Sequence, residues 1–184
     1  DEEGVVLGHR RLSILDLTEA GNQPMASSNG RYWLVFNGEI YNYLEIRKEL
    51  ESLGCSFRSN SDTEVLLQSY EQWGAACLQR FMGMYAFAIW DRERRELFAA
   101  RDRLGIKPFY YRETAHGLLF ASEIKSILSV QTGSREVEIS LIDPYLDFGY
   151  IPGEDTLHKG IKRLLPGYTL TWRNNRITIS KYWD

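Results

Sequence analysis

Short apolar runs separated by polar turns recur along this chain and predict several strands. The run at residues 33–36 predicts a buried strand that breaks at Asn37-Gly38, a pair that favours a tight turn. Residues 84–90 are apolar at successive positions, which predicts a central strand covered on both faces. Further strands are expected at residues 5–7, 96–100, 109–112 and 118–121, and in a hairpin that turns at Asn174-Asn175.

Two stretches instead carry apolar residues at spacings of three and four, which is typical of amphipathic helices. The first covers residues 42–53, with Asn42 as its expected cap and Leu53 at the end of its buried stripe. The second covers residues 62–73, and the sequence from Ser61 to Glu64 fits the S-x-x-E capping box. Shorter helices are expected at residues 122–128, capped by Ser122, and from Ser140 to Gly149.

Antiparallel strands that are buried on both faces, with helices on either side, predict an α+β fold. The expected architecture is a four-layer α/β/β/α sandwich formed by residues 1–130. Residues 131–138 are polar and are typical of a linker. We therefore expect residues 131–184 to form a linker and a peripheral C-terminal extension.

Composition narrows the class of protein. Hydrophobic residues make up 43% and charged residues 26% of the 184, the balance of a soluble globular protein. The formal net charge of −3 argues against nucleic-acid and anionic-membrane partners. No apolar run approaches the roughly 20 residues that span a bilayer, and no signal peptide is recognisable, so a cytoplasmic location is expected. Cys55 and Cys77 lack neighbouring ligands at metal spacing, which predicts no metal site.

The segment at residues 36–39 carries the first candidate chemistry. A turn at the end of a buried strand can direct the Asn37 side-chain amide and the Gly38 backbone N–H at one point, as an oxyanion site requires. The carboxylate of Glu39 follows directly. A strand–turn–helix connection without any chemistry has the same local sequence, so this segment alone leaves both interpretations open.

Longer blocks of sequence support the functional interpretation by resemblance. The blocks occur in one order: GHRRLSILD at 8–16, FNGEIYNY at 36–43, SDTEV at 61–65, FAIWD at 87–91, RDRLGIKPFYY at 101–111 and FASEIKSIL at 120–128. As a set they resemble the amino-terminal glutaminase domain of glutamine-hydrolysing asparagine synthetase. This is a class II amidotransferase domain with the N-terminal-nucleophile (Ntn) hydrolase fold. The resemblance covers nearly every residue of the chain.

The resemblance implies how glutamine is bound. Asn37 and Gly38 match the oxyanion donors, Arg11 matches the partner of the glutamine α-carboxylate, and Asp62 matches the acceptor for the α-ammonium. A free amino acid carries one anion and one cation at a fixed separation, so its site needs a fixed cation and a fixed anion. The rest of the implied pocket comprises Leu12, Ser13, Ile14, Leu15 and Glu39.

The resemblance also implies an amino-terminal cysteine whose thiolate attacks the glutamine amide, with its own α-amine as base. This chain starts at Asp1, so we expect a fragment without the nucleophile that is inactive by itself. Cys55 and Cys77 carry no free α-amine and are not expected to replace it. In the intact protein, ammonia would reach a C-terminal synthetase domain that uses ATP and magnesium to convert aspartate to asparagine. Glutamine and that domain are the implied partners, with no cofactor in this domain and a homo-oligomer expected.

Simpler interpretations exist for the same residues. Arg11 could be a surface ion-pairing residue, Asp62 could complement the dipole of the helix it begins, and Glu39 could be a solvated turn residue. A second hypothesis for the chain is a non-catalytic glutaminase-like module of an asparagine synthetase-like protein that amidates or cyclises another substrate. The coding sequence upstream of Asp1 distinguishes the two hypotheses, because a start that matures to cysteine supports the first and any other residue there supports the second. Absence of an ATP- and aspartate-dependent product with both glutamine and ammonium would exclude the first.

Overall fold

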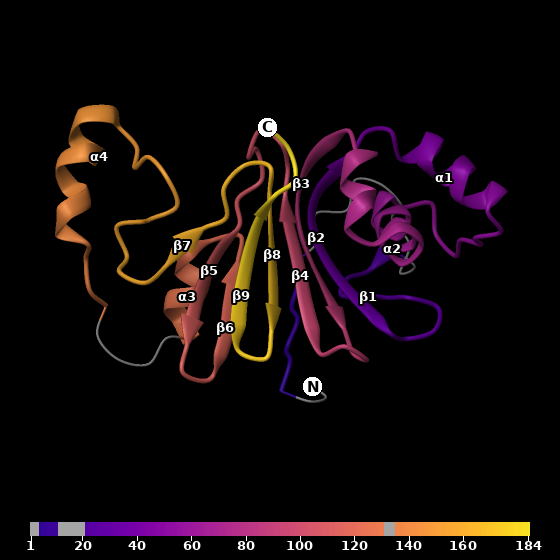
Figure 1. Ribbon diagram of the computed structural model, residues 1–184, viewed down its shortest axis with the longest axis horizontal. Coiled ribbons are helices and arrows are strands. Elements are labelled where there is room, and N and C mark those ends of the chain that lie inside the picture. Colours follow the sequence, from indigo (N-terminus) through magenta and orange to yellow (C-terminus); the bar gives the residue numbers. More distant parts are fainter. Residues whose placement is uncertain (1–3, 11–20, 131–134) are drawn as a thin grey trace.

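Two antiparallel sheets lie face to face at the centre of the molecule (Figure 1). The computed structural model describes residues 4–10, 21–130 and 135–184. Within these residues the larger sheet has six strands in the order β1-β2-β3-β4-β8-β9, and the smaller has three in the order β6-β5-β7. The strands of the larger sheet are β1 (Met25–Ala26), β2 (Tyr32–Ile40), β3 (Gly83–Asp91), β4 (Glu96–Arg101), β8 (Tyr168–Arg173) and β9 (Arg176–Lys181). Those of the smaller sheet are β5 (Tyr110–Thr114), β6 (Gly117–Ala121) and β7 (Lys162–Arg163).

Helices cover the outer faces of the two sheets (Figure 1). The larger sheet is covered by α1 (Tyr43–Ser52) and α2 (Asp62–Trp73), and the short 3-10 helix η2 (Gly74–Gln79) continues from α2. On the other side, α3 (Ile124–Val130) packs against β5 and β6. The layers therefore run helix, sheet, sheet, helix, which confirms the predicted α/β/β/α sandwich.

The strand β3 is buried on both faces, as its continuous apolar run predicts. Tyr85, Phe87 and Ile89 lie in an outer core, the apolar layer between the larger sheet and the helices α1 and α2. Ala86 and Ala88 lie in an inner core between the two sheets. Because alanine is small, this inner face leaves room between the sheets, and the cavity described below opens there.

The predicted turn at Asn37-Gly38 is wrong, because β2 continues through both residues as far as Ile40. Gly38 has φ +152°, and a Cβ atom built on it would lie 2.1 Å from the carbonyl oxygen of Met84 on β3. Glycine is therefore needed here for close approach between two paired strands, and the pair does not end the strand.

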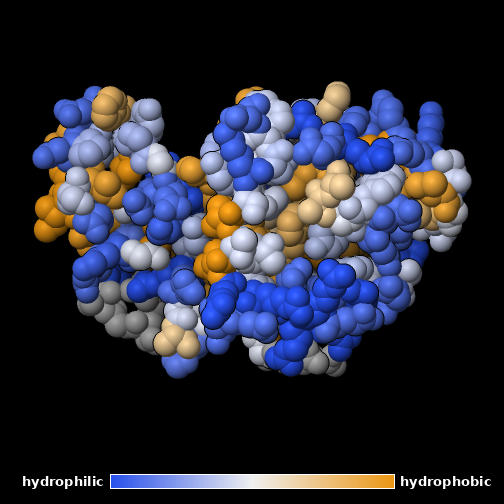
Figure 2. Space-filling model, viewed as in Figure 1, coloured by the Kyte–Doolittle hydropathy of each residue, from blue (hydrophilic) through white to orange (hydrophobic). Residues whose placement is uncertain are grey.

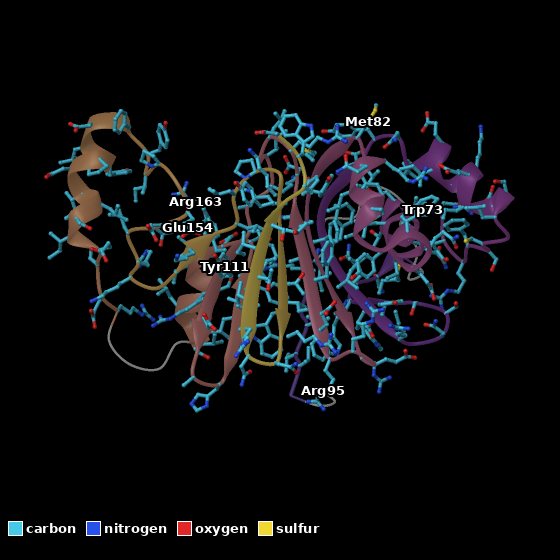
Figure 3. The ribbon with its side chains drawn as sticks, in the orientation of Figure 1. Trp73, Met82, Arg95, Tyr111, Glu154 and Arg163 are labelled. Carbon is cyan, nitrogen blue, oxygen red and sulfur yellow. The ribbon has the colours of Figure 1, made fainter. Side chains whose placement is uncertain are left out.

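Local signals predicted α2 well and α1 less well. The Ser61 hydroxyl accepts a hydrogen bond from the Glu64 N–H at 3.2 Å, and α2 ends at Trp73, beside the outer core (Figure 3). Asn42 occupies the N-cap position of α1, as predicted, but its side chain makes no capping bond and bonds instead to the backbone of residues 80 and 82. Leu53, expected on the buried stripe, is 53% exposed.

Smaller corrections concern the ends of the described segments. Residues 5–7 form no regular strand, since Val5 alone makes an isolated bridge. The helix expected to begin at Ser122 begins at Ile124. Ser140 lies inside the 3-10 helix η3 (Ile139–Leu141), where its hydroxyl donates to Glu138, and it does not cap α4 (Ile142–Phe148).

The C-terminal part of the chain belongs largely to the two sheets and is not peripheral. β8 pairs with β4, β9 follows in a hairpin, and β7 pairs with β5. Asn174 and Asn175 both have positive φ at the turn of this hairpin, as predicted. The predicted domain boundary at residue 130 stays a prediction.

The segment with η3 and α4 projects at the edge of the molecule, and exposed apolar residues gather on it (Figure 2).

Candidate functional site

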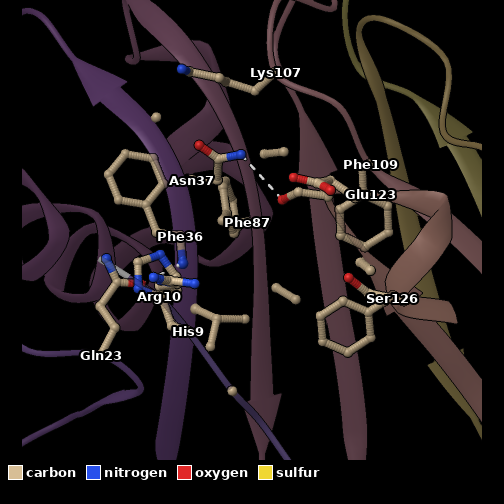
Figure 4. Close-up of a pocket in the computed structure, with 18 of the residues that line it drawn as sticks. His9, Arg10, Gln23, Phe36, Asn37, Phe87, Lys107, Phe109, Glu123 and Ser126 are labelled. Atoms are coloured by element: carbon tan, nitrogen blue, oxygen red, sulfur yellow. Dashed lines mark hydrogen bonds between the residues drawn. The ribbon is translucent and has the colours of Figure 1, made fainter. Parts of the chain in front are cut away.

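A cavity of about 720 Å³ lies between the two sheets, within the range of small-molecule sites. Its walls come from β2, β3, the junction of β6 with α3, the loop before β5 and residues 8–10 (Figure 4). Its apolar lining includes Val35, Ala86, Ala88, Phe109 and Phe120. Its polar lining includes Gln23, Asn37, Glu39, Asp62, Lys107 and Ser122.

Asn37 faces this cavity because side chains alternate along a strand. Val35, two residues earlier on β2, lies in the inner core, so Asn37 and Glu39 share its face toward the smaller sheet. The Asn37 Nδ2 donates a hydrogen bond to the Ser122 Oγ at 3.1 Å, marked by the dashed line in Figure 4. Asn37, Gly38 and Glu39, which were predicted together, therefore line one cavity.

The backbone N–H of Gly38 points away from β3. Its partner in the strand register is Tyr85, whose N–H donates to the Asp102 carboxylate at 3.2 Å and whose carbonyl accepts from the Asp102 N–H at 2.7 Å. Because Tyr85 uses both its N–H and its carbonyl toward Asp102, Tyr85 and Gly38 form a non-hydrogen-bonded pair. The N–H of Gly38 therefore makes no bond to Tyr85.

The neighbours of Gly38 on β2 identify what lies along that free edge. The Phe36 N–H donates to Gln23 Oε1 at 2.6 Å, and the Ile40 N–H donates to Asp62 Oδ2 at 3.0 Å. The Gly38 N–H lies between these two along the same edge, and β1 pairs with β2 only at Trp33 and Leu34. An amide side chain and a backbone N–H at adjacent residues therefore border the cavity, the arrangement that an oxyanion site needs.

Asp62 supplies a buried carboxylate at the start of α2, with 5% of its surface exposed. Burial raises its pKa, the N–H groups of Ile40 and Thr63 lower it in part, and the nearby charge of Glu39 raises it further. The carboxylate therefore has a structural partner in β2 and also lines the cavity. The predicted binding of the glutamine α-ammonium by Asp62 stays a prediction.

The predicted partner of the α-carboxylate, Arg11, lies outside the described residues, as do Leu12, Ser13, Ile14 and Leu15. The described residues just before them, Gly8, His9 and Arg10, line the cavity.

The further cavity residues to which the sequence interpretation assigned no role in the site include Gln23, Lys107 and Ser122. Two of these three lie in blocks that carried the resemblance, RDRLGIKPFYY and FASEIKSIL, which was the available signal. Lys107 is held in place by Asp102, which is fully buried and accepts hydrogen bonds from the N–H groups of Leu104, Ile106 and Lys107. The block thus builds a loop around one carboxylate and places a cation at the cavity.

The two cysteines lie away from the cavity. Cys77 is fully buried in the outer core, where desolvation raises the pKa of its thiol to about 12. Cys55 packs against the same core, and burial raises the pKa of its thiol as well. Neither provides a thiolate to the cavity, in agreement with the sequence interpretation.

Comparison with known proteins identifies the family. The family model described as a glutamine amidotransferase domain matches residues 1–183. The chain belongs to the class II glutamine amidotransferases. The amidotransferase domain is 42% identical over 187 residues to the glutamine-hydrolyzing asparagine synthetase 3 of Bacillus subtilis, covering 100% of this chain and 30% of that protein. It is also 37% identical to the amidase chry2 of Gibberella zeae, over 100% of this chain and 27% of that protein.

A solved structure agrees on the fold. The glutamine phosphoribosylpyrophosphate amidotransferase from B. subtilis matches the amidotransferase domain with a TM-score of 0.60 at 22% identity, over 87% of this chain and 31% of that one. The domain thus has the Ntn-hydrolase fold that the resemblance implied. The chain spans about 30% of the length of the curated relatives named above. Among the described residues, no helix combines the length and the apolar character needed to cross a membrane.

Proposed function

We propose that the cavity binds glutamine and that, in the intact protein, the domain hydrolyses the glutamine side-chain amide. The observation that supports this most directly is that the Asn37 amide, the Gly38 backbone edge and the Asp62 carboxylate border one cavity. Membership of the amidotransferase family adds the reaction class.

The charges are arranged as hydrolysis of a free amino acid requires. Asn37 and Gly38 are neutral donors, suited to an oxygen that becomes negative only in the transition state. Asp62 is instead a charged acceptor. Its carboxylate accepts from the Ile40 N–H with one oxygen and can also accept a hydrogen bond from an ammonium group. We assign Arg11 to the α-carboxylate, with Leu12, Ser13, Ile14, Leu15 and Glu39 completing the pocket.

Asn37→Ala in the intact protein tests the oxyanion role. Loss of one such donor lowers kcat for glutamate release about 10²–10³-fold, while synthesis from an ammonium salt stays at the wild-type rate because no amide is hydrolysed. Asn29→Ala is the matched control, since Asn29 bonds to Glu71 at the surface and does not line the cavity. An Asn37→Ala protein that releases glutamate at the wild-type rate would refute the assignment.

For the released ammonia we propose aspartate as the acceptor, with asparagine as the product and ATP and magnesium acting outside these 184 residues. The support is the similarity to the Bacillus asparagine synthetases, at 42% and 41% identity. The match to a relative with another name, amidase chry2, favours a second candidate: amidation of a different acceptor. Mass spectrometry of the products formed from ATP, aspartate and either glutamine or ammonium distinguishes the two candidates, because absence of asparagine with both nitrogen sources excludes aspartate as the acceptor.

We also propose that the intact protein is cytoplasmic and forms a homo-oligomer. Cell fractionation tests the location, and light scattering tests the oligomeric state.

A further inference from the structure

The hydrogen bond between Asn37 and Ser122 joins the two sheets beside the cavity. Asn37 lies on β2 of the larger sheet, and Ser122 directly follows β6 of the smaller sheet. Figure 4 shows this bond reaching across the space between the strands. The two residues are 85 positions apart in the chain, so the contact exists only because the sheets stack.

Both ends of the bond are held by regular structure. Asn37 pairs with Ala86 in the register of β2 and β3. On the other side, Ala121 pairs with Tyr110, so the backbone just before Ser122 belongs to a strand pair. Ser122 is therefore presented from a fixed position, and its hydroxyl can hold the Asn37 side chain in one orientation.

An amide side chain carries two N–H groups in one plane, and its direction changes with two rotatable bonds. A donor must lie within about 3 Å of the developing oxyanion, and misplacement by about 1 Å can cost 10²-fold in rate. Because one N–H of Asn37 is bound by the Ser122 hydroxyl, rotation of the amide is restricted. The second N–H is not used by that bond, and Asn37 and Gly38 both line the cavity.

We propose that Ser122 is a positioning residue for amide hydrolysis, which anchors the Asn37 side chain so that its second N–H meets the oxyanion. This role rests on the proposed function. A simpler role for Ser122 is to cap α3, which begins two residues later. The two roles differ in what they affect: a cap changes stability, whereas an anchor changes kcat.

The test measures glutamate release from glutamine by the intact protein. Ser122→Ala should lower kcat about tenfold with KM within about twofold, because the groups assigned to the α-carboxylate and α-ammonium are unchanged. Ser122→Thr keeps a hydroxyl and should restore most of kcat. Ser129→Ala is the control, since Ser129 lies on α3, the helix that follows Ser122, with an exposed hydroxyl that donates to the Ser126 carbonyl. It should match the wild type.

A double variant separates positioning from an independent effect. Asn37→Ala combined with Ser122→Ala should be no slower than Asn37→Ala alone, because Ser122 acts only through Asn37. Multiplied losses, an unchanged kcat in Ser122→Ala, or a raised KM with unchanged kcat would overturn the inference while leaving the proposed function in place. A wild-type protein that releases no glutamate would overturn both. If Ser122→Ala shows no thermal unfolding transition, Ser122→Cys takes its place in the cycle, with a smaller loss of kcat expected because its sulfur is only a weak acceptor.

Discussion

Asp62→Asn separates the structural from the proposed substrate role of the buried carboxylate. Asparagine keeps an oxygen that can accept the Ile40 N–H, so β2 and α2 stay joined as they are through Asp62. It removes the negative charge that we assign to the glutamine ammonium. The expected result is a folded protein with weakened glutamine use. A hydrogen bond to a charged group contributes about 1.5–3 kcal/mol, so kcat/KM should fall about 10- to 150-fold.

The pH dependence of stability gives a second, independent result. Burial raises the pKa of Asp62 in the folded state, so the folded protein holds this proton more tightly than the unfolded chain. Its contribution to the free energy of unfolding is therefore fully present below the unfolded pKa near 4 and is lost as pH rises through the higher folded pKa. Asparagine does not titrate, so the stability of the variant relative to wild type should increase as the pH rises above about 4.

Urea unfolding of the wild type and Asp62→Asn between pH 4 and pH 8 measures the pH-dependent difference in stability. Steady-state kinetics at neutral pH measures the fall in kcat/KM for glutamine. Asp62→Ala provides the contrast, because it leaves the buried Ile40 N–H without an acceptor. The cost is about 1–3 kcal/mol, or about 2–12 °C in Tm for a chain of this size. Wild-type glutamine kinetics in Asp62→Asn would refute the ammonium contact, and a stability difference independent of pH would refute the burial argument.

Three further predictions concern Gly38 on β2, the cap of α2 and the Cys77 thiol. Gly38→Ala should prevent stable folding, because the new Cβ meets the Met84 carbonyl at 2.1 Å, whereas Gly30→Ala, with open space around it, should cost only about 1–2 kcal/mol for its positive φ. Thermal unfolding compares the two, and equal Tm values would contradict the close-approach argument. Ser61→Ala should lower stability by about 1 kcal/mol through loss of the helix cap, measured by urea unfolding, and an unchanged midpoint would argue against the cap. Cys77 should react with a thiol reagent only on unfolding, and rapid labelling of the native protein would disagree with its burial.

Local signals were sufficient where a segment determines its own conformation. The helix α2 follows from the cap at Ser61 and from Gly74, which has φ +57° just after the helix, and both act within a few residues. The strand β3 follows from an apolar run that only a position between two packed layers can satisfy. The layered fold could therefore be predicted before any tertiary contact was known.

Signals failed where a distant contact overrides a local preference. Asn-Gly favours a turn, but here Gly38 permits a close approach to Met84, 46 positions further along the chain. Asn42 could cap a helix, but its amide bonds to the backbone of residues 80 and 82 instead. Ser122 was missed as a partner of Asn37 for the same reason, because nothing in either segment reports the spacing between the sheets.

The place of β8 beside β4 has a consequence for how the protein is made. On a ribosome, β4 is completed long before β8 emerges, so one edge of the nascent sheet stays open while the intervening residues are synthesised. Open strand edges are templates for pairing with other chains, and this edge is flanked by the buried run of β3. Until the hairpin of β8 and β9 has been synthesised, we expect the nascent domain to be more prone to aggregate with other chains.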